Sequence, residues 1–102
     1  MAVVTPGDLD AVLAQMWAGF APLARSRVEV LEQWLSGCDT GHDDADLRAA
    51  AASAAHKLAG ALGSYGRPGS DDASALEVLL RGPVTPDQVR PHVLALRAAV
   101  DA

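Results

Sequence analysis

The chain has 102 residues, half of them hydrophobic and only 4% aromatic, with a formal net charge of −5. This length suits one domain, and we treat residues 1–102 as a single domain. The acidic balance and the eight scattered basic residues argue against a protein that binds nucleic acid through clustered lysine and arginine. The one cysteine, Cys38, can form neither an internal disulfide nor a paired-cysteine metal site.

The sequence shows no signal for secretion or membrane insertion. Residues 1–8 lack a basic region followed by an apolar stretch, and no apolar run reaches bilayer-spanning length. We therefore expect a cytoplasmic protein without a membrane partner. Alanine, leucine and valine dominate the apolar residues, and no segment alternates as a strand would, so an all-α fold is expected.

The N-terminal part predicts two helices. Thr5 can cap the first, and Pro6 fits its first turn. A helical apolar period then runs over residues 9–20. Pro22 lacks the N–H that a helix interior needs, so we expect a break or kink there. The prediction is a short helix followed by a longer one that ends at about Gly37.

Three further helices are predicted between short polar loops: residues 45–64, 70–81, and 86 onward. Asp43 or Asp44 can cap the first of these. Thr85-Pro86-Asp87-Gln88 forms a capping-box pattern before the last. Amphipathic helices joined by short loops favour an antiparallel four-helix bundle. With the short N-terminal helix added, this is the predicted fold.

His56 falls on the predicted solvent face of the helix over residues 45–64. At about 100° per residue, it lies roughly 150° from the centre of the apolar stripe. That stripe consists of Leu47, Ala51, Ala54, Ala55, Leu58 and Leu62. The residues around His56 on the helix are all small: Ala52, Ser53, Ala59, Gly60 and Gly63. Solvent faces normally carry long charged side chains. The pattern fits an imidazole open to another macromolecule, although an isolated exposed histidine is more often ordinary surface.

The segment Ala55–Gly66, AHKLAGALGSYG, resembles the signature of histidine-containing phosphotransfer (HPt) domains of multistep phosphorelays. Matches in type and spacing fall at His56, Leu58, Gly60, Gly63 and Gly66. The resemblance implies a four-helix bundle core with an extra N-terminal helix. It also implies that His56 accepts a phosphoryl group from an aspartyl phosphate on a response-regulator receiver domain and passes it to another receiver. A hybrid histidine kinase would be a further partner.

The resemblance implies that the receiver supplies Mg²⁺, so no cofactor is expected on this chain. One position departs from the family pattern: Ala59 stands where a lysine or arginine is common, three residues after the histidine. Lys57 and Arg67 are candidates to replace that charge. We expect the contacts to phosphate or partner at Ser53, Lys57, Ala59, Gly60, Gly63 and Arg67.

The residues themselves fit a carrier rather than an enzyme. An exposed imidazole is a nucleophile through the lone pair of its neutral ring. The sequence contains no Walker or kinase-type glycine-rich loop for ATP. Apolar residues of the N-terminal helices can contribute to docking: Met16, Trp17 and Phe20, which fit the core better, or Leu23 and Val30. We expect a monomer.

Two alternatives stay open. A non-phosphorylated docking module would bind a receiver or kinase through the same face, and Ala59 keeps this hypothesis in play. A metal site formed by His42, His56 and His92 would need three histidines from different elements, and they show no short-range ligand spacing. We therefore expect no metal site.

Overall fold

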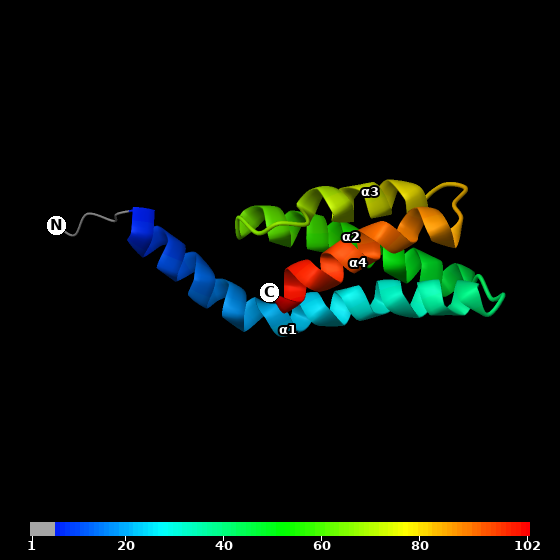
Figure 1. Cartoon of the computed structure of the whole chain (residues 1–102), viewed down its shortest axis with the longest axis horizontal. Helices are drawn as coiled ribbons and strands as arrows, with labels where there is room; N and C mark the ends of the chain where they lie inside the picture. Colours follow the sequence, from blue (N-terminus) through cyan, green and yellow to red (C-terminus); the bar gives the residue numbers. More distant parts are fainter. Residues whose placement is uncertain (1–5) are drawn as a thin grey trace.

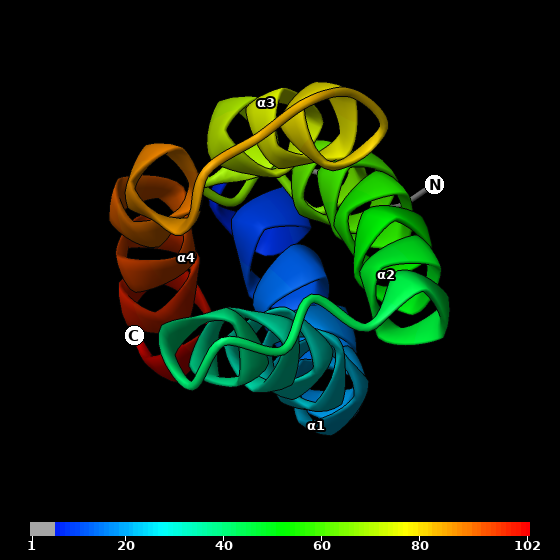
Figure 2. The same ribbon diagram turned by 90° about the vertical axis from the view of Figure 1, so that its right-hand side faces the viewer.

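The computed structural model describes residues 6–102, which form four α-helices and, within that range, no strand. Their bounds are α1 Pro6–Asp39, α2 Ala45–Ser64, α3 Ser70–Leu80 and α4 Pro86–Asp101. Each helix packs against the next, and α4 returns to α1, so the end-on view shows a ring of four helices (Figure 2). The predicted all-α bundle is confirmed. Over the described range no helix is both long and apolar enough to cross a membrane.

The prediction of two N-terminal helices is wrong, because α1 is one continuous helix of 34 residues; of the break or kink expected at Pro22, only a kink is compatible with it. Pro22 lies inside it and leaves the carbonyl of Ala18 without its usual helical donor. Both residues are exposed, so water can solvate that carbonyl, and the helix bends instead of ending (Figure 1). The predicted extra N-terminal helix is therefore not present as a separate element. The proposed cap, Thr5, lies outside the described residues.

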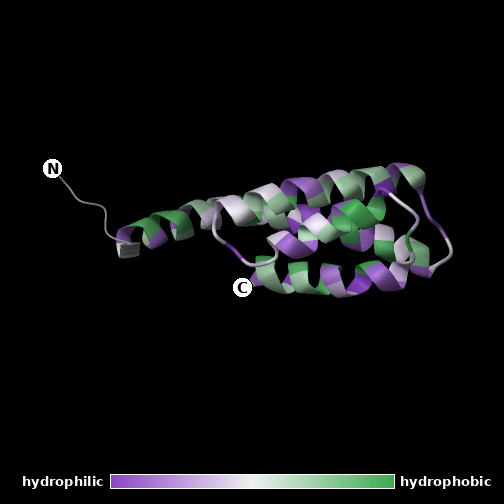
Figure 3. Ribbon diagram, turned by 90° about the horizontal axis from the view of Figure 1, so that it is seen from above, coloured by the Kyte–Doolittle hydropathy of each residue, from purple (hydrophilic) through white to green (hydrophobic). Residues whose placement is uncertain are grey.

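The first part of α1 reaches beyond the bundle (Figure 1). At 1.5 Å per residue, α1 is about 51 Å long and α2 only about 30 Å. We call residues 6–16 the α1 arm. Within it, Leu9, Val12 and Met16 are each about half exposed. Figure 3 shows hydrophobic residues along this part of the helix, where no other helix covers them.

The buried face of α2 is the predicted one. Ala51, Ala54, Ala55, Leu58 and Leu62 are buried, and Leu47 is half-buried against the same core. They pack with apolar residues of the other three helices, including the buried Trp34 of α1. Burying this stripe fixes the rotation of α2 about its axis. The opposite side of α2, which carries His56, therefore faces solvent.

The predicted cap of α2 is present, and so is one of the two hydrogen bonds of the capping box of α4. The side chain of Asp44 accepts a hydrogen bond from a first-turn N–H of α2 at 2.9 Å. Asp43, the other candidate, instead accepts from Trp34 Nε1 at 3.0 Å. At the start of α4, Gln88 Oε1 accepts from the Thr85 N–H at 2.9 Å, as the capping box requires.

A glycine sets the start of α3. Gly69 has φ +104°, and a Cβ added there would lie 3.3 Å from a side-chain atom of Leu62 and 3.2 Å from one of Leu96. Both the backbone conformation and the space therefore require glycine. The next residue, Ser70, donates its hydroxyl to the carbonyl of Ala59 at 2.9 Å. This bond joins α3 to α2 within one turn of His56.

Candidate functional site

His56 is an exposed side chain on a surface of small residues. Its side chain is 70% exposed. Gly60, one turn later, has no atom within 4 Å of where a Cβ would stand, and Gly63 is also exposed. Ser53 and Ala59 are half-buried, whereas Ala52, which was also expected on this face, is buried in the core. Nothing in α2 covers the ring from that side, so a large partner can approach the imidazole closely.

A carboxylate on the neighbouring helix holds the ring of His56. Its Nδ1 lies 3.0 Å from Oε1 of Glu77 on α3. An ionised carboxylate only accepts hydrogen bonds, so Nδ1 carries the hydrogen and donates it. In the neutral ring, Nε2 then bears the free lone pair. This nucleophilic nitrogen lies on the side of the ring away from Glu77.

Glu77 also binds a second cationic group. Its other oxygen, Oε2, accepts from Arg81 Nε at 3.2 Å and Nη2 at 3.1 Å. The hydrogen bond from His56, and after it the contacts with Arg81, hold the pKa of the Glu77 carboxyl below its usual value despite partial burial. Glu77 therefore stays ionised at neutral pH and can keep the His56 ring in one tautomer.

The two basic residues expected near His56 have different positions. Lys57 is exposed and points about 100° round α2 from His56. Arg67 lies past the end of α2. Measured along the axis of α2, it is at least about 12 Å from His56. Its Nη2 donates to the carbonyl of Ala102 at 3.1 Å. Its guanidinium stacks 4.7 Å from the ring centre of Trp17. The prediction that Arg67 joins this site is not supported, because Arg67 links α1 and α4 instead.

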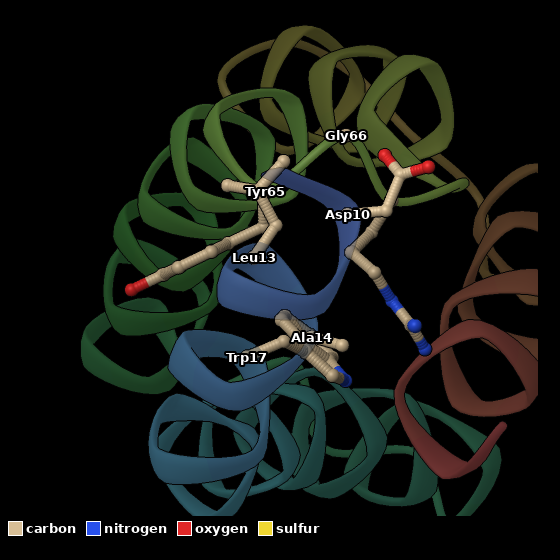
Figure 4. Close-up of a pocket in the computed structure, with 7 residues that line it drawn as sticks. Asp10, Leu13, Ala14, Trp17, Tyr65 and Gly66 are labelled. Carbon is tan, nitrogen blue, oxygen red and sulfur yellow. The ribbon is translucent and has the colours of Figure 1, made fainter. Parts of the chain in front are cut away.

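Arg67 borders a separate cavity of about 240 Å³ between α1 and the end of α2 (Figure 4). Its lining residues are Asp10, Leu13, Ala14, Trp17, Tyr65, Gly66 and Arg67. Figure 4 shows Trp17 on α1 and Tyr65 at the end of α2, and their ring centres lie 5.8 Å apart in an edge-to-face contact. None of the residues on α2 that surround His56 lines it. The cavity is thus distinct from the His56 surface.

The apolar candidates for docking divide into core and surface. Trp17 is buried, and Phe20 is half-buried, with its ring centre 5.4 Å from that of Tyr65. Both serve the core, as expected. Met16, which was expected to fit the core with them, is instead exposed, and so is Leu23. Val30 is half-buried against the core.

The three histidines do not converge. His92, on α4, places Nδ1 2.9 Å from Oδ1 of Asp72 on α3, and its side chain is 32% exposed. His42 lies in the loop after α1. Among residues 6–102, no group of three or more histidine, cysteine, aspartate or glutamate side chains is placed to hold a metal ion. The alternative of a three-histidine metal site is therefore not supported.

Sequence reasoning missed the α3 side of the site. Glu77 and Arg81 stand four residues apart in a helix, a spacing that can indicate a surface ion pair. That signal identifies the pair but not its neighbour, because His56 is 21 residues away in the chain. Val78, next to Glu77, is 74% exposed and is a further apolar residue on this helix.

One comparison with known proteins identifies a family. A model of the protein family described as Hpt domain matches residues 15–102. The match begins close to Trp17, where α1 starts to pack on the bundle, and it includes His56. Searches of curated proteins and of solved structures gave no match. Because the family match covers most of its length, the chain belongs to the Hpt domain family.

Proposed function

We propose that His56 accepts a phosphoryl group on Nε2 from the aspartyl phosphate of a response-regulator receiver domain and passes it to another receiver. Hpt domains are phosphotransfer modules of two-component signalling, phosphocarriers rather than classical enzymes. The observation that carries the proposal is the pairing of His56 Nδ1 with Glu77 on a 70% exposed side chain. This arrangement leaves the nucleophilic nitrogen free and accessible.

The transfer step balances with the groups available. The lone pair of Nε2 forms the N–P bond while the P–O bond of the acyl phosphate breaks, and the receiver's aspartate leaves as a carboxylate. The hydrogen on Nδ1 stays in place, so the ring gains positive charge as the bond forms. The carboxylate of Glu77, 3.0 Å from Nδ1, stabilises that charge. The same bond orients the ring for in-line attack.

The receiver is expected to dock on the solvent side of α2 and α3, which we call the acceptor face. It is formed by the exposed or half-exposed residues Ser53, His56, Lys57, Gly60, Gly63, Glu77 and Val78. Small residues on α2 let the partner's backbone approach the ring, and Val78 offers apolar contact. Mg²⁺ and most of the groups that act on the phosphoryl transition state would come from the receiver.

A phosphotransfer assay tests the proposal. The purified protein is mixed with a panel of phosphorylated receiver domains, and label on the protein is followed over time. The wild type is expected to gain an acid-labile, base-stable phosphate, and His56→Gln is expected to gain none. His92→Gln is a matched control, because His92 also pairs Nδ1 with a carboxylate, that of Asp72, but between α3 and α4. It should transfer like the wild type.

The rival is a docking module that binds a receiver without accepting phosphate. Ala59 in place of the family's basic residue is the observation that favours it. If the wild type binds receivers but gains no phosphate from any receiver of the panel, the docking-module hypothesis is established. Equal labelling of the wild type and His56→Gln would contradict both readings of His56.

A further inference from the structure

The helix that carries His56 offers no cation at the position where Hpt-type sequences commonly place one. That position is Ala59, which is half-buried and packs against the core, and its carbonyl accepts the Ser70 hydroxyl. A phosphoryl group on His56 would add negative charge next to the ionised Glu77. The positive charge on the ring offsets only part of this negative charge, so a further cation nearby would stabilise the phosphorylated state.

Arg81 is the cation that the structure connects to His56. Its guanidinium binds one oxygen of Glu77 through Nε and Nη2, while the other oxygen binds the imidazole. The Arg81 guanidinium is therefore separated from the His56 ring by only the Glu77 carboxylate and the hydrogen bonds on its two sides. Its side chain is 58% exposed and can change rotamer without disturbing the core.

Arg81 also has room to reach the phosphoryl group. The antiparallel pairing of α2 and α3 sets His56 beside Glu77, and Arg48 beside the carbonyl of Leu80. Arg81 thus lies level with the turn of α2 that precedes His56. Residues 49–53 of α2 are only alanine and serine, and the long side chain nearby on that helix, Arg48, is held on the carbonyls of Leu80 and Gly82.

We propose that Arg81, on α3, supplies the positive charge for phosphorylated His56 in place of the basic residue that Ala59 lacks. The inference rests on the proposed function of His56. In the unphosphorylated state Arg81 binds Glu77. After transfer, this exposed side chain can change rotamer, turn from Glu77 toward the phosphoryl group on Nε2 and bind its oxygens with the planar fork. It offsets both negative charges from the side of His56 opposite to Ala59.

The test is a ³¹P NMR titration that needs no receiver. Phosphoramidate, a small phosphodonor, phosphorylates the folded wild type and the Arg81→Gln, Lys57→Gln and Arg81→Gln/Ala59→Lys variants, each in a His42→Gln/His92→Gln background. The pKa of the phosphoryl group is then read from its chemical shift. A nearby cation lowers this pKa because it favours the dianion. Arg81→Gln should raise it by at least about 0.5 pH unit, Lys57→Gln should leave it unchanged, and the double change should restore it.

An unchanged phosphoryl pKa in Arg81→Gln would overturn the proposal, and a rise in Lys57→Gln alone would give the role to Lys57. The same samples are offered to unphosphorylated receivers. Arg81→Gln should shift the equilibrium toward phosphorylated receiver by about fivefold, the worth of one partly exposed charge-assisted contact. If the chemically phosphorylated wild type passes nothing to any receiver, the proposed function fails, while the titration still decides the role of Arg81.

Discussion

Replacing Gly60 by alanine should stabilise the domain and slow phosphotransfer at the same time. Gly60 lies inside α2 with a helical backbone, and a Cβ there would meet no atom within 4 Å. Alanine should therefore gain about 1 kcal/mol from helix propensity and from the smaller entropy of the unfolded chain. For a domain of this size, that corresponds to a rise in melting temperature of about 4–8 °C.

The effect on transfer has the opposite sign. The added methyl group stands one turn from His56, on the surface that the receiver must approach. Crowding a close-packed contact by one carbon typically costs about 1–3 kcal/mol, so even the lower limit slows transfer about fivefold. Thermal unfolding followed by circular dichroism measures the first effect. The initial rate of labelling by a phosphorylated receiver measures the second.

Gly19→Ala is the matched control. Gly19 is also an exposed helix glycine with open space around its Cβ position. Gly19 lies at the level of the end of α2, because its neighbour Phe20 packs against Tyr65. It is therefore far from His56. The Gly19→Ala variant should be stabilised by an amount similar to that of Gly60→Ala, and its rate of phosphotransfer should equal that of the wild type. A destabilised Gly60→Ala protein, or a stabilised one that transfers at the wild-type rate, would refute the reasoning about the acceptor face.

Three further predictions concern stability. Glu77→Gln should lower the melting temperature at pH 5, and the difference from the wild type should shrink as the pH falls below about 4. The reason is that a carboxylate with a lowered pKa loses its stabilising effect when it is protonated. Thermal melts across this pH range measure the difference, and a difference that persists at pH 2.5 would contradict the prediction. Gly69→Ala should destabilise the domain by about 1–3 kcal/mol in urea unfolding, because of its positive φ and the contacts at 3.2–3.3 Å; an unchanged midpoint would show that α3 can shift. Asp44→Ala should lose about 1 kcal/mol with the α2 cap, whereas Asp44→Asn should retain most of it; equal losses in urea unfolding would argue against capping.

Local patterns along the chain predict much of this fold. The start of α2 at Ala45, the cap at Asp44 and the capping box at Gln88 depend on residues within one turn of each other. The exposure of His56 follows from the apolar period of its own helix. The continuity of α1 through Pro22 does not, because it depends on whether the freed carbonyl can meet water and on how the following residues pack.

The second half of the site could not be predicted because it depends on packing between helices. Glu77 reaches His56 only because α3 packs antiparallel to α2 in one register, which the Gly69 turn and the Ser70 bond help to set. Arg67 shows the same limit. Its place in the sequence, just past α2, suggested a phosphate contact, but Trp17 and the end of α4 hold it elsewhere.

The central claim is that Nε2 of His56 carries the phosphoryl group while Nδ1 stays bonded to Glu77. The most direct test is NMR of the uniformly ¹⁵N-labelled protein after transfer from a receiver, reading which ring nitrogen couples to phosphorus. We predict coupling to Nε2 of His56 alone, with the hydrogen retained on Nδ1. Coupling to Nδ1, or to a nitrogen of His42 or His92, would contradict the account.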